Sequence, residues 1–187
     1  MPFFILLAFV IILILLFVGS YNSLVKIRNQ VRNAWKQIDV QLKRRHDLIP
    51  NLVNAVKGQM GFEKSTLEGV IQARAAAVGA KNITESIEKE DMLSSALSKL
   101  FAVVENYPTL KANESVQPLM EELTTTENQI SFARQFYNDI TTTFNTKLEI
   151  FPTNLFASSL GFKEFPLFQV KDAAEREVPT VDLSLKE

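Results

Sequence analysis

An unbroken run of sixteen apolar residues, Phe3 to Val18 (FFILLAFVIILILLFV), lies close to the start of the chain. About 20 apolar residues in a helix cross the roughly 30 Å hydrocarbon core of a bilayer, and Met1, Pro2 and Gly19 extend this run to nineteen. A soluble helix would keep a polar face, which this run lacks. We therefore predict a transmembrane anchor over residues 1–20, whose apolar surface includes Phe3, Phe4, Ile5, Phe9, Ile12, Leu16, Phe17 and Val18.

A cleaved signal peptide is the alternative interpretation of this run. Val18, Gly19 and Ser20 resemble the small-residue site at which such peptides are cut. However, no Lys or Arg precedes the run, and the run is long for the apolar part of a signal peptide. We favour a retained, single-pass anchor.

Charge is unevenly distributed along the 187 residues, whose formal net charge is −1. Residues 20–49 contain seven Lys or Arg and two Asp, so this segment carries +5 and the rest of the chain −6. Basic residues beside a span favour the cytoplasmic side. We expect the span to lie in the membrane that bounds the cytoplasm, with the body on the cytoplasmic side. The nearly neutral total excludes a strongly basic nucleic-acid-binding protein.

Beyond the anchor, apolar residues recur at helical spacing. The first stripe consists of Leu24, Ile27, Val31, Ala34, Ile38 and Leu42. A second stripe runs from residue 49 to 71 with an expected end at Gly79, and a third runs from 93 to 104 before Pro108 stops it. Between the first two, Asp47 could cap a new helix that has Pro50 in its first turn, or Pro50 could kink one very long helix.

The last helix is predicted to begin at Ser115, its expected N-cap, and to end at Pro152. Its apolar residues repeat every seven positions: Val116, Leu123, Ile130, Tyr137, Phe144 and Phe151. Such a repeat indicates extended coiled-coil packing against other helices. Long helices with short connections form antiparallel bundles. We therefore predict an all-α protein, with a four-helix bundle over residues 21–151.

The tail from residue 152 to 187 is rich in Phe and too apolar for a free linker. It could cover one end of the bundle, or it could dock a partner or a second copy. The candidate docking residues are Phe156, Phe162, Phe165 and Phe168. Residues 181–185 alternate with period two, which would suit a strand added to another sheet edge or a segment without fixed structure.

Several motifs resemble the bacterial LemA family. They are RNQVRNAWKQIDVQLKRRHDLIPNLVNAVKG (28–58), EKSTLEGVIQARAAA (63–77), YPTLKANES (107–115), TTENQISFARQFYNDITTTFNTKLEIFPTNLFA (125–157) and GFKEFPLF (161–168). The resemblance implies an apolar N-terminal segment, an antiparallel four-helix body and a link to membranes, as in relatives that act in magnetosome formation. Some relatives resemble lipoproteins that have a Cys shortly before the pair corresponding to Tyr21 and Asn22 of this chain. Here Gly19 and Ser20 take that place, which excludes lipidation at this site.

The sequence offers little catalytic equipment. It has no cysteine and one histidine, His46, and it contains no Glu-x-x-His, G-x-S-x-G or phosphate-binding Gly loop. We interpret His46 as a cation at a helix end and predict no cofactor, metal or catalytic set.

Polar residues within the family motifs form a candidate network: Asn33, Asp39, Glu127, Asn128, Arg134 and Asn138. A buried pair of the Asp39–Arg134 kind could fix helix register.

Two function classes follow from these observations. The favoured one is a membrane-anchored scaffold or assembly protein of the envelope, which forms a homo-oligomer or holds an envelope partner protein. The alternative is an envelope enzyme or small-ligand binder that uses the polar network. The missing catalytic equipment and the long heptad seam favour the scaffold.

Overall fold

The computed structural model describes residues 1–57 and 64–168. Its elements are α1 (Pro2–Lys57), α2 (Lys64–Val78), α3 (Ile83–Glu105), α4 (Pro108–Lys111), α5 (Val116–Glu149) and the 3₁₀ turn η1 (Thr153–Leu155). No strand occurs in these two ranges, so the all-helical prediction is confirmed for them. The alternating segment 181–185 lies outside the described residues.

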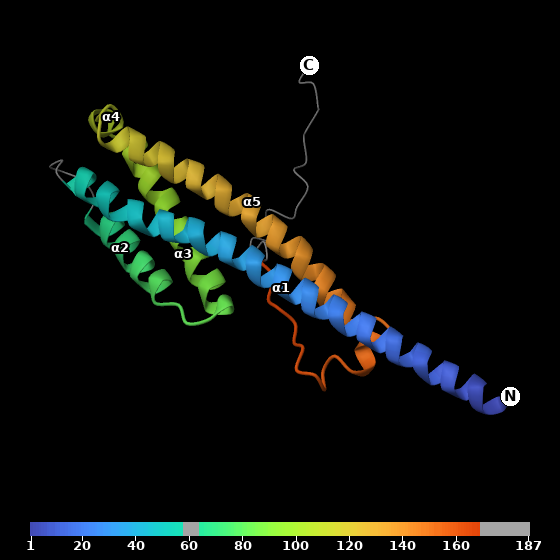
Figure 1. Ribbon diagram of the computed structural model, residues 1–187. Coiled ribbons are helices and arrows are strands. Elements are labelled where there is room, and N and C mark those ends of the chain that lie inside the picture. Colours follow the sequence, from blue (N-terminus) through green and yellow to red (C-terminus); the bar gives the residue numbers. More distant parts are fainter. Residues whose placement is uncertain (58–63, 169–187) are drawn as a thin grey trace, which may run out of the picture.

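Helix α1 contains both the apolar run and the central stripe of the body (Figure 1). Its N-terminal part is the one stretch of the described chain that is long and apolar enough to cross a membrane, and none of that stretch is buried within the protein. The buried stripe begins at Leu24 and continues to Val56. The predicted anchor and the body are therefore joined by continuous helix rather than by a flexible linker.

Pro50 lies inside α1, so the interpretation of Asp47 as the cap of a new helix is wrong. Proline lacks the N–H that would bond to the carbonyl four residues earlier, which here belongs to His46. That carbonyl instead accepts a hydrogen bond of 2.7 Å from Nε of Arg74 on α2. A side chain from another helix thus supplies the missing donor.

Helices α1 and α5 pack along most of the body (Figure 1). Lys147, near the end of α5, donates to Ser23 near the beginning of the body, whereas Glu122, near the start of α5, accepts from Arg44. These two contacts join the end of α5 to the beginning of the body on α1, and the start of α5 to a later part of α1. Helices α2 and α3 form the second closely packed pair.

The heptad pattern of α5 predicts its buried face well. Five of its positions have exposed fractions of 2% or less: Val116, Leu123, Ile130, Tyr137 and Phe144. Phe151, the sixth, lies beyond the end of α5 and is 76% exposed. Ser115 makes no side-chain capping bond, and its own N–H donates to Oδ1 of Asn113 at 2.8 Å instead.

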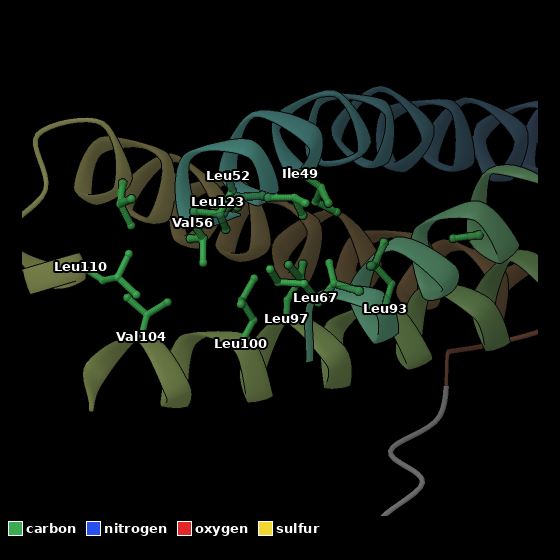
Figure 2. Packing of buried hydrophobic residues seen from close by; sticks show 14 residues of the cluster. Ile49, Leu52, Val56, Leu67, Leu93, Leu97, Leu100, Val104, Leu110 and Leu123 are labelled. Atoms are coloured by element: carbon green, nitrogen blue, oxygen red, sulfur yellow. The ribbon is translucent and has the colours of Figure 1, made fainter. Parts of the chain in front are cut away.

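The body has two apolar clusters. The distal cluster, far from the anchor, gathers aliphatic side chains from α1 to α5, and Figure 2 shows Leu52, Leu67, Leu100 and Leu123 pointing toward one another. The proximal cluster lies nearer the anchor and holds Leu24, Ile38, Tyr137 and Phe144 from α1 and α5, together with tail residues. The tail thus supplies cover where α2 and α3 do not reach.

Candidate functional site

A charged side chain lies at the boundary between the two clusters. Arg45 of α1 is 0% exposed. The proximal cluster ends at Leu42 on this helix and the distal cluster begins at Ile49. Because a buried charge must be paired and hydrogen-bonded, the residues around Arg45 form the strongest candidate site.

Two carboxylates neutralise Arg45. Its Nη2 donates to Glu90 of α3, which is 1% exposed, and its Nη1 donates to Glu127 of α5. Nη1 also donates to Oγ of Ser94 at 2.8 Å, and Ser94 in turn donates to Glu127 at 3.2 Å. One guanidinium therefore joins α1, α3 and α5.

His46 extends the cluster on the side of α2. Its Nε2 lies 2.7 Å from Oε1 of Glu90. Burial raises the pKa of Glu90, but the hydrogen bond from His46 and the charge of Arg45 outweigh it and hold that pKa below its ordinary value of 4.5. His46 thus lies inside α1 and is a partner of the buried carboxylate of Glu90 on α3. The interpretation of His46 as a cation at a helix end is wrong, because α1 continues to Lys57.

A second ion pair lies two turns further along α5. Nη1 of Arg134 is 3.3 Å from Oδ1 of Asp91 on α3, and its guanidinium carbon lies 4.7 Å from the centre of the Phe168 ring. Burial lowers the pKa of Arg134, and Asp91 opposes that effect. Asp39, named above as a candidate partner for Arg134, lies on the exposed face of α1.

The remaining network residues have different places. Asn33 and Asn128 are exposed. Asn138 binds the tail: its Nδ2 donates to the carbonyl of Phe168 at 2.9 Å, and its Oδ1 accepts from the N–H of Phe168 at 3.0 Å. The structure thus brings Glu127 and Arg134 into the ionic cluster, while Asn138 holds the tail.

Asn145 makes the same pair of bonds with the backbone of Phe165, at 3.0 and 3.1 Å. Tyr137 adds a bond from its hydroxyl to the carbonyl of Pro166 at 2.9 Å. Burial raises the pKa of Tyr137 above its ordinary value of 10.0. Side chains of α5 thereby replace the hydrogen bonds that an extended segment would otherwise make with water.

The four Phe rings proposed for docking lie against their own chain. Phe162 is 5% exposed, and Phe156, Phe165 and Phe168 are partly buried in the proximal cluster. Phe168 stacks on Trp35 at a centroid distance of 5.9 Å. Gly161, with φ of 75°, adopts the left-handed conformation that favours glycine and turns the chain so that Phe162 enters the cluster. Among the described residues from 151 to 168, the large exposed apolar ones are instead Phe151, just before the tail, and Leu155 and Leu160 within it.

The ionic cluster leaves little room for a ligand. A cavity of about 80 Å³ lies beside Glu127 and Ser94. Sites for small organic molecules usually span about 300–1,000 Å³. In residues 1–57 and 64–168, the acidic and His side chains form no group of three or more that could hold a metal ion. The arrangement is therefore suited to fixing helix register.

Sequence reasoning missed Arg45, Glu90 and Asp91. A signal for Arg45 was present, because Leu24, Val31, Ile38, Arg45 and Leu52 follow one another at seven-residue intervals. A cation at a seam position predicts a buried acidic partner. Glu90 likewise lies at helical spacing between the buried Ile87 and Leu93.

The predicted anchor residues share one property: each is exposed in the protein, with fractions from 44% at Phe17 to 71% at Ile5. The whole set is Phe3, Phe4, Ile5, Phe9, Ile12, Leu16, Phe17 and Val18. A surface this apolar on every side is typical of a helix whose solvent is lipid.

Comparison with known proteins assigns the chain to a family. The profile of the LemA family matches residues 34–183. Protein LemA of Metamycoplasma hominis is 29% identical over 168 residues, which cover 89% of this chain and 77% of that protein. Magnetosome protein MamQ 2 of Paramagnetospirillum magneticum is 26% identical, covering 87% of this chain and 70% of that protein. Magnetosome protein MamQ of Magnetospirillum gryphiswaldense is 24% identical, covering 86% and 68%. Because the profile covers most of its length, the chain belongs to the LemA family.

Proposed function

We propose that this protein is a membrane-anchored helical scaffold of the bacterial envelope that associates with itself or holds a partner protein. The observation that carries this proposal is the continuity of α1, which joins an exposed apolar run to the seam of the body. A rigid connection of this kind holds a body at a fixed distance from the bilayer. The similarity to two magnetosome proteins also supports a role at a cellular structure.

In this proposal the body is an antiparallel four-helix bundle built from α1, α2, α3 and α5. Its buried charges neutralise one another, and the small cavity beside Glu127 supports a structural rather than an enzymatic role. The body lies in the cytoplasm in this proposal, which the basic segment after the anchor supports.

A surface for self-association lies across α1 and α5. Val40 is 65% exposed, Phe132 is 72% exposed and Phe136 is 48% exposed, and all three line a groove of about 470 Å³ with Gln and Ala residues. Large exposed apolar side chains that cluster on one face mark interaction sites more often than isolated ones do. We propose that a second copy of the body covers this groove.

The mass of the full-length protein in mild detergent tests the proposal. We expect a defined oligomer that Phe132→Glu reduces to a monomer. The control is Val78→Glu, which changes a residue that is 58% exposed on α2, away from the groove. Deletion of residues 1–20 should leave an oligomer of the same kind, because the anchor lacks a small-xxx-small packing face. A strict monomer from the intact protein would contradict self-association.

Membrane orientation is tested separately. The chain has no cysteine, so single cysteines can be introduced at exposed sites such as Asn33 and Asn128. An impermeant thiol reagent is added to whole spheroplasts. We expect the cysteines at positions 33 and 128 to remain unlabelled in whole spheroplasts and to be labelled after lysis. Labelling before lysis would place the body outside the cytoplasm.

A further inference from the structure

The turn that follows α5 has an unusual surface. No residue from Ile150 to Phe162 carries a charged side chain. Within this turn, Ile150 is 50% exposed, Phe151 76%, Leu155 73% and Leu160 44%. These four side chains, called here the foot, do not belong to either apolar cluster of the body.

The turn lies beside the end of the apolar run of α1 (Figure 1). The rings of Phe156 and Phe17 are 4.7 Å apart, and those of Phe162 and Tyr21 are 5.9 Å apart. Phe17 is the last residue but one of the uncharged, unbroken apolar run. The turn therefore reaches the same level along α1 as the end of the predicted span, and its exposed apolar surface continues that of the anchor.

The cost of moving the backbone of the turn out of water is reduced, because several of its N–H groups bond to carbonyls of the same turn. The N–H groups of Asn154, Leu155 and Ala157 donate to carbonyls within the turn, at 3.0, 3.3 and 2.9 Å. Those of Leu160, Gly161 and Phe162 do so at 3.1, 3.0 and 3.0 Å. Segments that enter a bilayer must satisfy backbone groups internally in this way. An exposed loop that remains in water has no such requirement.

We propose that the foot is a second membrane contact, which inserts Ile150, Phe151, Leu155 and Leu160 into the interfacial layer of the bilayer that α1 spans. This proposal rests on the anchoring role of α1 proposed above. The occupant of this surface is lipid, because the foot is continuous with the exposed apolar surface of the anchor and lacks charges that would require water. Two contacts then fix the rotation of the body about the α1 axis, which a single helix leaves free.

The test uses the full-length chain in liposomes, with one introduced cysteine carrying an environment-sensitive fluorophore. The label is placed at Leu155, and the matched control is at Val78, an exposed apolar residue of α2 on the body. We expect emission at shorter wavelength from position 155, with quenching by lipid-attached nitroxides several-fold stronger than at position 78. Equal, water-like emission at the two positions would overturn the proposal.

A third label at Leu13, inside the predicted span, separates the two proposals. Quenching at Leu13 but not at Leu155 would refute the foot alone, whereas no quenching at Leu13 would refute the anchor. Shorter-wavelength emission at Leu155 that lipid quenchers leave unchanged, and that weakens as the protein is diluted in lipid, would identify a protein interface and overturn the lipid assignment.

Substitution provides the second measurement. Phe151→Glu introduces a charge into the foot at an exposed position, outside both apolar clusters, so the fold measured by circular dichroism should remain intact. We expect this change to return the label at Leu155 to water-like emission, while Val78→Glu leaves it unchanged. Persistent lipid quenching at Leu155 in Phe151→Glu would overturn the assignment of Phe151 to the contact.

Discussion

The distal and proximal halves of the body enclose their apolar residues by different means. The distal half surrounds aliphatic side chains with helices on several sides, so Leu, Val and Ile suffice there (Figure 2). In the described part of the chain, the only helices of the proximal half are α1 and α5, and an extended segment rich in Phe completes its core. A pair of helices cannot enclose a core alone, because each leaves an apolar stripe uncovered. The tail therefore covers the proximal core as α2 and α3 cover the distal one.

The two halves also differ in how the covering element is held. Helices α2 and α3 satisfy their own backbone groups, whereas the tail depends on Asn138, Asn145 and Tyr137. Between the halves, Arg45 binds α3 and α5 together. Changes at the boundary should therefore affect the whole body, and changes in the tail should loosen the proximal half first.

Arg45→Ala is expected to have the largest effect. It leaves Glu90 buried without its guanidinium partner, and losing one member of a buried pair costs about 3–5 kcal/mol of unfolding free energy. Thermal unfolding followed by circular dichroism in detergent measures the loss. Arg44→Ala is the matched control, because the Arg44–Glu122 pair is 49% and 41% exposed and such a pair contributes only about 0–1 kcal/mol. Equal effects of the two changes would contradict the assigned role of Arg45.

Leu100→Ala tests the distal half. Leu100 is 0% exposed in the aliphatic cluster, and replacing a buried Leu by Ala costs about 2–5 kcal/mol. We expect hydrogen exchange to accelerate in α2 and α3 before the proximal half of α5. Uniform acceleration along α5 would show that the two halves unfold as one unit.

Asn145→Ala tests the proximal half. It removes both bonds to the backbone of Phe165, at about 0.5–1.5 kcal/mol for each hydrogen bond. Local opening around the tail should become faster by hydrogen exchange, with little change in α3. Asn128→Ala, at an exposed site of the same helix, is the control and should change stability by less than about 0.5 kcal/mol.

Lowering the pH is expected to have the smallest effect on stability. The reason is that burial of Glu90 opposes the contacts that lower its pKa. A carboxylate with a lowered folded-state pKa adds stability above its unfolded value of 4.5, and this contribution is lost as the pH falls through the folded value. Denaturant titrations at decreasing pH should show this loss in the wild-type protein. Glu90→Gln should be less stable at neutral pH and less sensitive to acid, and an unchanged acid response would remove Glu90 from this role.

Periodicity predicted those parts of the fold whose structure depends on repeated apolar burial. The heptad of α5 gave its buried face, and Gly79 and Pro108 marked helix ends close to those observed. The continuity of α1 through Pro50 could not be predicted, because it depends on Arg74 of another helix donating to the carbonyl of His46. The residues around Pro50 do not indicate that Arg74 supplies this donor.

The candidate site was predictable in part for a related reason. A heptad count places Arg45 in a buried seam, but its partners Glu90 and Glu127 come from two other helices whose relative register no local pattern fixes. The sequence offered Asp39 as one candidate partner for Arg134, whereas the observed partner is Asp91. Asn138 and Asn145 bind backbone rather than side chains, and the extended segment they hold has no periodicity to indicate its position.

The continuity of α1 also has a mechanical consequence. From Val18 to Lys57 the helix extends about 58 Å, at about 1.5 Å per residue. With the anchor placed as proposed, a change of roughly 10° in its tilt would swing Lys57 through about 10 Å, and helices in bilayers adopt tilts across about 0–40°. Bilayer thickness would then be converted into displacement of the distal end, as a lever amplifies a small rotation at its pivot.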